Sequence, residues 1–295
     1  MINRDAGEEI DSRFGRCDDK NYLTMPELQR ITSRDNERLK FARRVRDGKE
    51  PRFILIEGPR LAEEALSSGI GIRSVFVTDD FISNKAFGKL DTNLNARVAE
   101  AFAVSESNLS SISDAKTPQG ITLIGYRPND RDLAEVFDHS DPDLSILIFL
   151  SQVNNPSNLG AVIRTAEASG ARGVITSNKS ADPYSPKAIR ASAGSVFRMP
   201  VVSDVETANC VEEARRAGMK IVAIDAKGTL RHTNVDWKTP TMLIFGSEAF
   251  GLSDELIEKV DSVVRIDMAS PVESLNLAVS AGIVLFEARR QVLNA

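Results

Sequence analysis

"LSILIFLSQVNNPSNLGAVIRTAEASGARGVIT", residues 144–176, holds in one stretch the elements that decide the fold. A nearly continuous apolar run at 144–150 predicts a buried strand, and residues 158–170 have the spacing of a helix that ends at Gly170. Residues 173–176 predict a second strand. A strand, a helix and a strand in this order indicate two parallel strands joined by a crossover helix.

The alternation continues to the end of the chain. Further strands are predicted at 220–225, 241–245 and 262–266, and further helices at 185–192, 206–218, 253–260 and 275–293. Ser185 precedes Pro186 and Ser253 precedes two acidic residues, which suits the starts of helices. The pattern predicts an α/β domain whose parallel sheet is covered by helices on both faces. Ligands in such sheets bind beyond the carboxyl ends of the strands, which singles out the loops 151–160, 246–251 and 267–276.

The first half of the chain predicts a second, smaller unit. Strands are expected at 52–57, 72–77, 97–104 and 120–125, with helices at 59–69 and 108–113. We therefore divide the chain into a mobile extension (1–28), a small α/β domain (29–127), a linker (128–143) and the larger α/β domain (144–295). A length of 295 residues agrees with roughly two domains.

The bulk composition is that of a soluble globular protein. Hydrophobic residues make up 42% and charged residues 27%, and no apolar run approaches the roughly 20 residues that span a bilayer. The first 20 residues lack the apolar segment of a signal peptide. Cys17 and Cys210 lie far apart, and neither His139 nor His232 has the spacing of a metal site or a catalytic triad. We expect a cytoplasmic protein without a metal or a membrane partner.

One basic stretch stands out against the net charge of −5. Residues 30–52 hold nine Arg and Lys against four Asp and Glu, and they predict a helix with Ser33 as its N-cap. Two interpretations stay open: an ordinary solvated helix face, or a positive patch that contacts a phosphate backbone.

The loop "GSEAFG" (246–251) has the two glycines of a phosphate-binding P-loop but not its chemistry. Leu252 stands where that motif has lysine, and Glu248 would repel a triphosphate. Neither a G-x-G-x-x-G nor a G-x-S-x-G motif follows a strand. The three loops instead offer Asn, Ser and Glu side chains, and an Arg follows the first of them, which suits group transfer from a cosubstrate that carries the chemistry.

Three ordered motifs resemble a known family. "NNPSNLGAVIRTAEASGA" (154–171), "FGSEAFGLSDE" (245–255) and "IDMASPVESLNLAVSAGIVLFE" (266–287) are similar to the signatures of the SpoU/TrmH family in the SPOUT superfamily. "AIRASAGSVFRMPVV" (188–202) resembles the segment between the first two motifs. "LIEGPRLAEEAL" (55–66) and "TPQGITLI" (117–124) resemble the ribosomal-protein-like substrate-binding domain that often accompanies the family.

The resemblance implies an S-adenosylmethionine-dependent RNA ribose 2′-O-methyltransferase. It implies a trefoil-knotted α/β fold and a homodimer, with an N-terminal RNA-binding domain. The family's cofactor positions fall on Gly246, Ile266 and Leu275, with Met268 nearby. The residues themselves leave core packing open as the role of Ile266 and Leu275.

The family's catalytic arginine falls on Arg164, which would grip a phosphate and stabilise the developing alkoxide, since an arginine stays protonated. Asn158, Glu248, Ser274 and Asn276 match the remaining polar site residues. Asn158 and Asn276 can alternatively act as helix caps.

Three positions depart from the family pattern: Ala249, Asp267 and Ser270. The carboxylate of Glu248 suits a positively charged sulfonium better than phosphates. The expected activity is methylation of ribosomal RNA. Two alternatives stay open: a transfer-RNA 2′-O-methyltransferase, and a non-catalytic RNA-binding or ribosome-assembly factor on the same fold.

Overall fold

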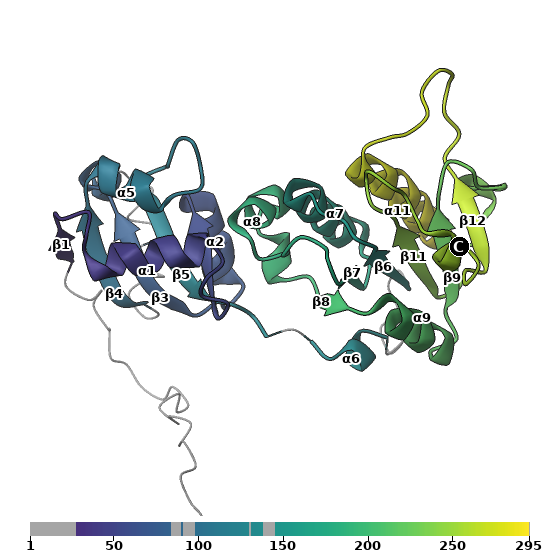
Figure 1. Cartoon of the computed structure of the whole chain (residues 1–295), viewed down its shortest axis with the longest axis horizontal. Coiled ribbons are helices and arrows are strands. Elements are labelled where there is room, and N and C mark those ends of the chain that lie inside the picture. The colour runs from purple at the N-terminus through teal and green to yellow at the C-terminus, as the bar shows by residue number, and fades with distance from the viewer. Residues whose placement is uncertain (1–27, 84–89, 91–97, 130, 138–144, 295) are drawn as a thin grey trace, which may run out of the picture.

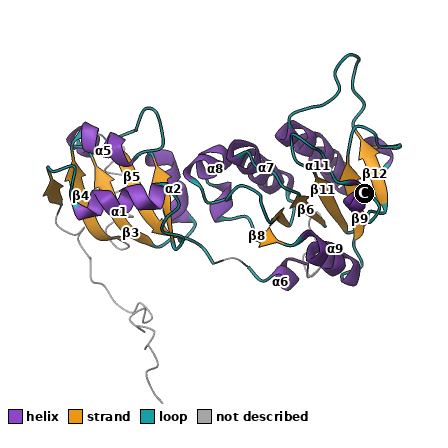
Figure 2. Cartoon of the chain, in the orientation of Figure 1, coloured by secondary structure: helices purple, strands orange, loops and turns teal. Residues whose placement is uncertain are grey.

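The computed structural model describes residues 28–83, 90, 98–129, 131–137 and 145–294, which form two α/β domains, each built on its own sheet (Figure 1; Figure 2). Residues 1–27 of the expected extension lie outside the described residues, as do Cys17 and His139. The expected linker 128–143 is described in part, and it contains a short helix, α6 (Leu133–Phe137). This helix, whose Val136 and Phe137 are buried, was not predicted.

The N-terminal domain contains a mixed sheet of five strands in the order β1-β4-β3-β5-β2. β1, β4 and β3 run parallel, whereas β5 is antiparallel to both β3 and β2. The strands are β1 (Gln29–Ile31), β2 (Phe53–Glu57), β3 (Ile72–Val77), β4 (Val98–Val104) and β5 (Ile121–Tyr126). The four longer strands confirm the sequence predictions, whereas β1 is too short for a periodic pattern to reveal it.

Helices cover both faces of this sheet. α1 (Glu37–Arg46) and α5 (Glu106–Ile112) share a buried cluster with strand residues such as Phe76, and α2 (Pro59–Ser67) packs on the other face. A fourth helix, α3 (Asp79–Ile82), is short. The prediction of Ser33 as the cap of α1 is wrong. Asn36 caps the helix by accepting a hydrogen bond from Arg38 N at 2.8 Å, while Ser33 accepts one from Asp35 N in the preceding turn.

The C-terminal domain contains seven strands in the order β10-β12-β9-β11-β6-β7-β8, and every neighbouring pair is parallel. The strands are β6 (Ile146–Leu150), β7 (Gly173–Ser177), β8 (Val201–Val205), β9 (Lys220–Ile224), β10 (Leu230–Arg231), β11 (Thr241–Phe245) and β12 (Ser262–Arg265). The predicted parallel sheet is confirmed. β8 and the two-residue β10 were not predicted. A short 3₁₀ turn, Ser195–Phe197, precedes β8, and β8 itself is an edge strand in which only Val201 and Val202 are buried, so its sequence lacks a clear strand pattern.

Helices pack on both faces of the parallel sheet, as predicted (Figure 2). One side holds α7 (Pro156–Ser169), α8 (Pro186–Ser192) and α11 (Leu277–Leu293), and the other holds α6, α9 (Thr207–Arg216) and α10 (Asp254–Ile257). The predicted caps Ser185 and Ser253 are confirmed, and Gly170 ends α7 in the left-handed conformation. A second 3₁₀ turn spans His232–Asn234. In the parts of the chain that the structure describes, each helix is too short or too polar to cross a bilayer.

The two domains meet where α8 packs against β2 and where α2 faces the turn after α8 (Figure 1). Arg190 of α8 donates to the buried carboxylate of Glu57 at 2.6 Å and also to Asp114. Arg198 bridges Glu167 of its own domain, at 2.6 Å, and Glu64 of the other. One cluster of buried side chains runs through both domains, so their arrangement is held by apolar packing as well as by charge.

Candidate functional site

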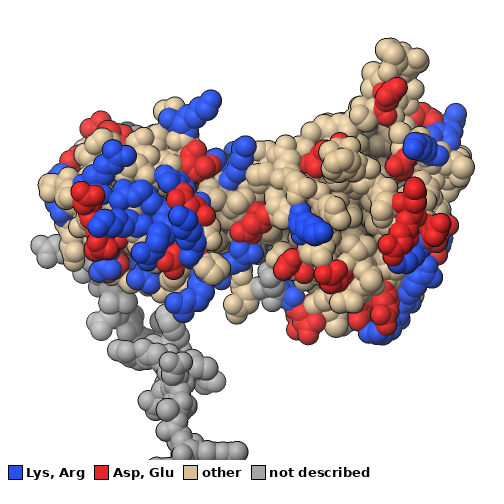
Figure 3. All heavy atoms as spheres, in the orientation of Figure 1, with Lys and Arg blue, Asp and Glu red and all other residues tan. Residues whose placement is uncertain are grey.

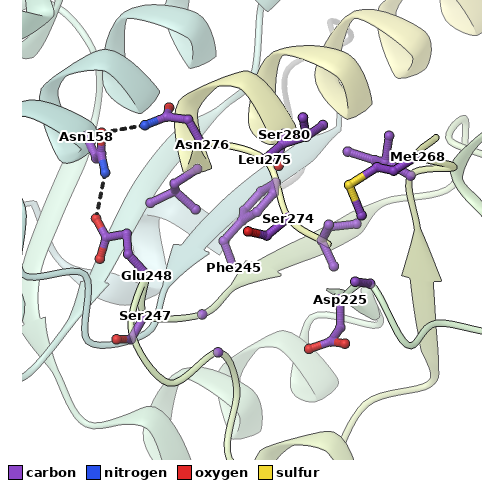
Figure 4. Close-up of a pocket in the computed structure, with 16 residues that line it drawn as sticks. Asn158, Asp225, Phe245, Ser247, Glu248, Met268, Ser274, Leu275, Asn276 and Ser280 are labelled. Carbon is purple, nitrogen blue, oxygen red and sulfur yellow. Dashed lines mark hydrogen bonds between the residues drawn. The ribbon is translucent and has the colours of Figure 1, made fainter. Parts of the chain in front are cut away.

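A cavity of about 500 Å³ opens at the carboxyl end of the parallel sheet (Figure 4). It lies where the sequence predicted ligand binding, beyond the ends of β9, β11 and β12. Its lining consists of Asn158, Ile224, Asp225, Ala226, Phe245, Gly246, Ser247, Glu248, Gly251, Ile266, Met268, Ser274, Leu275, Asn276, Leu277 and Ser280. Eight of the nine predicted site residues are among them, and Arg164 is the exception.

Three side chains from three separate segments join in a hydrogen-bonded relay along one wall (Figure 4). Asn276 Nδ2 donates to Asn158 Oδ1 at 3.0 Å, and Asn158 Nδ2 donates to Glu248 Oε1 at 2.9 Å. The relay connects the first turn of α7, the loop after β11 and the start of α11. It thereby fixes the three family-like motifs relative to one another.

Asn158 and Asn276 differ in whether they cap a helix. Asn155, not Asn158, caps α7 by accepting from Ser157 N at 2.9 Å. Asn158 therefore lies inside the helix, and its amide is used wholly within the relay. Asn276 does both, because its Oδ1 accepts from Ala278 N at 2.9 Å as the cap of α11 while its Nδ2 donates to Asn158.

The loop 246–251 folds back on itself. Ser247 N donates to Gly251 O at 3.1 Å and Gly251 N donates to Ser247 O at 2.8 Å. This closure brings the two glycines together, so that a Cβ on Gly246 would lie 2.3 Å from the carbonyl carbon of Gly251. Gly246 is thus required by close backbone packing. Phe250, at the tip, is 90% exposed.

The loop 266–276 supplies apolar surface to the cavity. Ile266 is partly buried and packs on the core while it also lines the cavity, so core packing and ligand contact are compatible there. Leu275 is 37% exposed, which excludes core packing as its role. Asp267, one of the departures from the family pattern, pairs with Arg231 at 2.9 Å and Arg265 at 3.1 Å. Neither Asp267 nor the other departures, Ala249 and Ser270, belong to the lining.

The cavity is negative in character. Asp225 and Glu248 line it, and none of the described residues in its lining is a Lys or an Arg. Asp225 was not predicted as a site residue, and neither were other lining positions such as Ser247 and Ser280. The position of Asp225 could have been found, because it is the last residue of the predicted strand 220–225, and the carboxyl end of that strand meets the same edge as the other three loops.

Arg164 lies apart from this cavity, although it is on the same helix as Asn158. Six positions along α7 correspond to about 9 Å of rise and about 240° of rotation, so the two side chains leave the helix in different directions. Arg164 is exposed and lines a second cavity, of about 340 Å³, between the two domains. Nothing in the single chain brings its guanidinium into the first cavity.

The remaining candidate groups are structural. His232 lies in a 3₁₀ turn, and its carbonyl oxygen accepts a hydrogen bond from Trp237 Nε1 at 2.8 Å. Cys210 is buried in the core, and this burial raises the pKa of its thiol. Within the described ranges, no three His, Cys, Asp or Glu side chains gather in a way that could hold a metal ion. The absence of a metal stays a prediction.

Comparison with known proteins gives matches over both domains. The family model "SpoU rRNA Methylase family" matches residues 145–286, and the model "MRM3-like substrate binding domain" matches residues 36–122. A Synechocystis protein described as an uncharacterized tRNA/rRNA methyltransferase is 30% identical over 92% of this chain and 97% of its own length. The Bacillus subtilis 23S rRNA (guanosine(2553)-2′-O)-methyltransferase RlmP is 28% identical over 89% of this chain and 100% of its own length.

Solved structures agree. The AdoMet-bound rRNA methyltransferase from Sinorhizobium meliloti superimposes with a TM-score of 0.78 at 31% identity, over 89% of this chain and 98% of that one. The SpoU methyltransferase AviRb from Streptomyces viridochromogenes, in complex with AdoMet, gives a TM-score of 0.77 at 26% identity, over 88% and 99%. The likeness therefore extends over nearly the whole length of each protein.

Proposed function

The chain belongs to the SpoU rRNA methylase family, and from this premise we propose that it transfers the methyl group of S-adenosylmethionine to a ribose 2′-hydroxyl of ribosomal RNA. The observation that carries the proposal is the relay Asn276–Asn158–Glu248, which joins the three family-like motifs around one cavity. A chain that had lost the activity would have no need to keep these side chains in register. Two of the relatives named above, from Bacillus subtilis and Sinorhizobium meliloti, are described as acting on ribosomal RNA, and the Synechocystis protein is described as acting on transfer or ribosomal RNA.

S-adenosylmethionine supplies an electrophilic methyl group on a positively charged sulfur. We assign its binding to Gly246, Ile266, Met268 and Leu275, which combine close backbone approach with apolar side chains that suit an adenine ring. The carboxylates of Asp225 and Glu248 complement the charge of the sulfonium. We assign Ser274, Asn158 and Asn276 to positioning the ribose and the loops.

We propose that Arg164 activates the target from a second copy of the chain. Since its guanidinium faces away from the cofactor cavity of its own chain, a dimer can supply it to the cavity of the other. α11 supports a dimer, because Val279, Phe286 and Leu293 recur every seven residues and are all exposed. The guanidinium would grip a phosphate and stabilise the oxyanion that forms as the hydroxyl loses its proton.

The N-terminal domain supports an RNA substrate. Lys and Arg side chains gather over α1 on the face in view in Figure 3. Several of them are held in place, for example Arg73, whose guanidinium lies 4.7 Å from the ring centre of Phe41 and 5.1 Å from that of Phe53. Such a patch can contact a phosphate backbone even though the whole chain is acidic.

The remaining expectations belong to the same proposal. We propose 29–127 as the RNA-binding domain, 144–295 as the methyltransferase domain, and a trefoil knot in the latter. We also propose that the protein acts in the cytoplasm. Size measurement by light scattering tests the dimer, and a monomer at micromolar concentration contradicts it.

The test of function is methyl transfer with labelled S-adenosylmethionine and total RNA from cells that lack the enzyme, followed by mapping of ribose methylation. Label at a ribosomal-RNA ribose supports the proposal. Label in transfer RNA alone corrects the substrate. A chain that binds the cofactor by calorimetry but labels no RNA is a binding factor, and the proposal fails.

A further inference from the structure

The cavity between the domains has the features of an anion site. It is lined by the end of β2 and the start of α2 on one side, the loop 115–119 and the start of β5 below, and α7 and α8 on the other side. The lining is Glu57, Gly58, Arg60, Leu61, Ala115, Thr117, Pro118, Gln119, Ile121, Thr122, Arg164, Arg190 and Ala193. Its volume of about 340 Å³ lies within the range of roughly 300–1,000 Å³ that is typical of small-molecule sites.

Three arginines line this cavity against one glutamate, but they are not equivalent. Arg190 is already neutralised, because it pairs with Glu57 and Asp114 and so holds the domains together. Arg60 and Arg164 are exposed, and neither guanidinium has a hydrogen bond or an ion pair within the described part of the chain. Two uncompensated guanidinium groups, one from each domain, therefore lie on one cavity.

The N-terminus of α2 adds to the same field. Gly58 stands at the cap position and has no side chain to accept from the first N–H groups of the helix. The α2 residues Arg60 and Leu61, which follow it, also line the cavity. Uncapped N–H groups and the helix dipole favour an anion at this position.

The cavity also contains neutral polar side chains that can form hydrogen bonds with other parts of a ligand. The Gln119 side chain lies against Gly58, where a Cβ would come within 2.7 Å of its Oε1. The Thr122 residue is only 1% exposed, and its hydroxyl has no hydrogen-bond partner among the residues described. A buried hydroxyl without a partner is costly, by about 1–3 kcal/mol, unless water or a ligand satisfies it.

We propose that this interdomain cavity binds a nucleotide of the substrate RNA next to the one that is methylated. Its phosphate lies at the N-terminus of α2 between Arg60 and Arg164, and Gln119 contacts its base or ribose. Arg164 thus faces the phosphate backbone on the side where RNA arrives from the N-terminal domain. The identity of the ligand as RNA rests on the proposed function, whereas the anion site rests on the cavity alone.

The direct test needs neither turnover nor cofactor. The full chain, labelled with ¹³C at Leu and Ala methyl groups, is titrated with the four nucleoside 5′-monophosphates, with the corresponding nucleosides and with inorganic phosphate. We expect saturable shifts at Leu61, Ala115 and Ala193, and tighter binding of at least one nucleotide than of its nucleoside or of phosphate. Arg60→Gln and Gln119→Ala should each weaken nucleotide binding by about tenfold.

Two outcomes overturn the proposal. One is a lack of shifts at these three methyl groups with every probe. The other is equal affinity for inorganic phosphate and the best nucleotide, which makes the cavity a site for free phosphate. Lys220→Gln is the matched control, because this exposed lysine begins β9, at the opposite end of the strand from the cofactor cavity, and should change nothing.

A second measurement separates this inference from the proposed function. In methyl transfer to RNA, Arg60→Gln should raise KM about tenfold while kcat and the affinity for S-adenosylmethionine stay within about twofold. If the parent chain transfers methyl groups and Arg60→Gln leaves KM unchanged, the inference fails and the function stands. If the parent chain labels no RNA but binds nucleotides at Arg60, the function fails and the anion site stands.

Discussion

The two cavities of this molecule are opposite in charge, although one helix, α7, contributes to both. The cofactor cavity has two carboxylates and no Lys or Arg in its lining, and it is built almost wholly by loops at the carboxyl edge of the parallel sheet. The interdomain cavity has three arginines and one carboxylate, and it requires both domains. The fold thus separates a region suited to a sulfonium cation from a region suited to phosphates.

This difference explains why the family-like motif 154–171 contains both Asn158 and Arg164. The asparagine lies in the first turn of α7 and joins the acidic cavity, whereas the arginine lies further along and joins the basic one. The helix α7 therefore contributes one residue to each of the two cavities. A substitution in one cavity should therefore leave ligand binding in the other cavity intact and measurable.

The largest effect is expected from Arg164→Ala. We expect turnover to fall by about 100-fold or more, because a group that stabilises a developing oxyanion is lost, while the affinity for S-adenosylmethionine stays within about twofold. Single-turnover methyl transfer and calorimetry measure the two quantities. Lys187→Ala on α8 is the control for loss of an exposed cation. A parallel loss of cofactor affinity would contradict the separation of the two cavities.

Gly246→Ala should impair ligand binding in the cofactor cavity and leave the interdomain cavity unchanged. The new Cβ would meet the Gly251 backbone at 2.3 Å, so the loop 246–251 must open and cofactor affinity should fall by at least about tenfold. RNA binding, measured by filter retention, should persist. Ala249→Gly is the matched control in the same loop, because position 249 lies outside the lining. An unchanged cofactor affinity would show that the loop does not approach the ligand.

Asp225→Asn tests whether the negative charge of the cofactor cavity contributes to ligand binding. The change keeps an oxygen for the hydrogen bond from Lys227 N but removes a negative charge from the cavity. We expect affinity for S-adenosylmethionine to fall by about threefold to tenfold, and affinity for S-adenosylhomocysteine, which lacks the sulfonium charge, to stay nearly the same. Equal losses for the two ligands would mean that Asp225 acts through shape and not through charge.

The smallest effect concerns the ion pair between Arg198 and Glu167, inside the C-terminal domain, at low pH. The hydrogen bond from Arg198 lowers the pKa of Glu167 below its usual value of about 4.3. A lowered pKa in the folded state contributes stability that is fully present above the usual pKa and is lost as the pH falls through the lowered one. We expect Arg198→Ala to reduce the free energy of unfolding at pH 7 by about 1 kcal/mol or less, since the pair is partly exposed.

Urea unfolding of the full chain between about pH 7 and pH 3 measures this contribution. The variant and the parent should differ at neutral pH and converge as Glu167 becomes protonated. Lys220→Ala, which removes a cation without a partner carboxylate in the described chain, should run parallel to the parent at every pH. A constant difference between Arg198→Ala and the parent down to pH 3 would exclude Glu167 as the source.

Much of the fold could be predicted from the sequence because many of its helices and strands are long and the residues that begin or end them are typical of helix and strand boundaries. Gly170, Ser185 and Ser253 end or begin helices where they were expected. The exceptions are short or lack a period. β10 has two residues, and α6 is a single turn in a polar segment. Ser33 was chosen as a cap on residue type alone, although Asn36, three positions later, is an equally good cap and directly precedes the helix.

The cofactor cavity could be predicted from the rule that ligands bind at the carboxyl ends of parallel strands, together with the resemblance of the motifs. Asp225 lies directly after β9, at a fourth strand end on the same edge of the sheet, which was not among the three predicted loops. The separate place of Arg164 could not be predicted. It depends on the direction in which a side chain leaves α7 and on a second domain whose placement no local pattern encodes.

Asn276 limits what evolution can do at its position. Its side-chain amide has two roles. The oxygen caps α11, and the nitrogen donates to Asn158 in the wall of the cofactor cavity. Aspartate would keep the first role and lose the second, and alanine would lose both. A relative that has lost methyl transfer still needs a hydrogen-bond acceptor at this position to cap the helix. Replacement of asparagine by aspartate or serine in relatives would therefore be an early sign that a methyltransferase has become a non-catalytic binding protein.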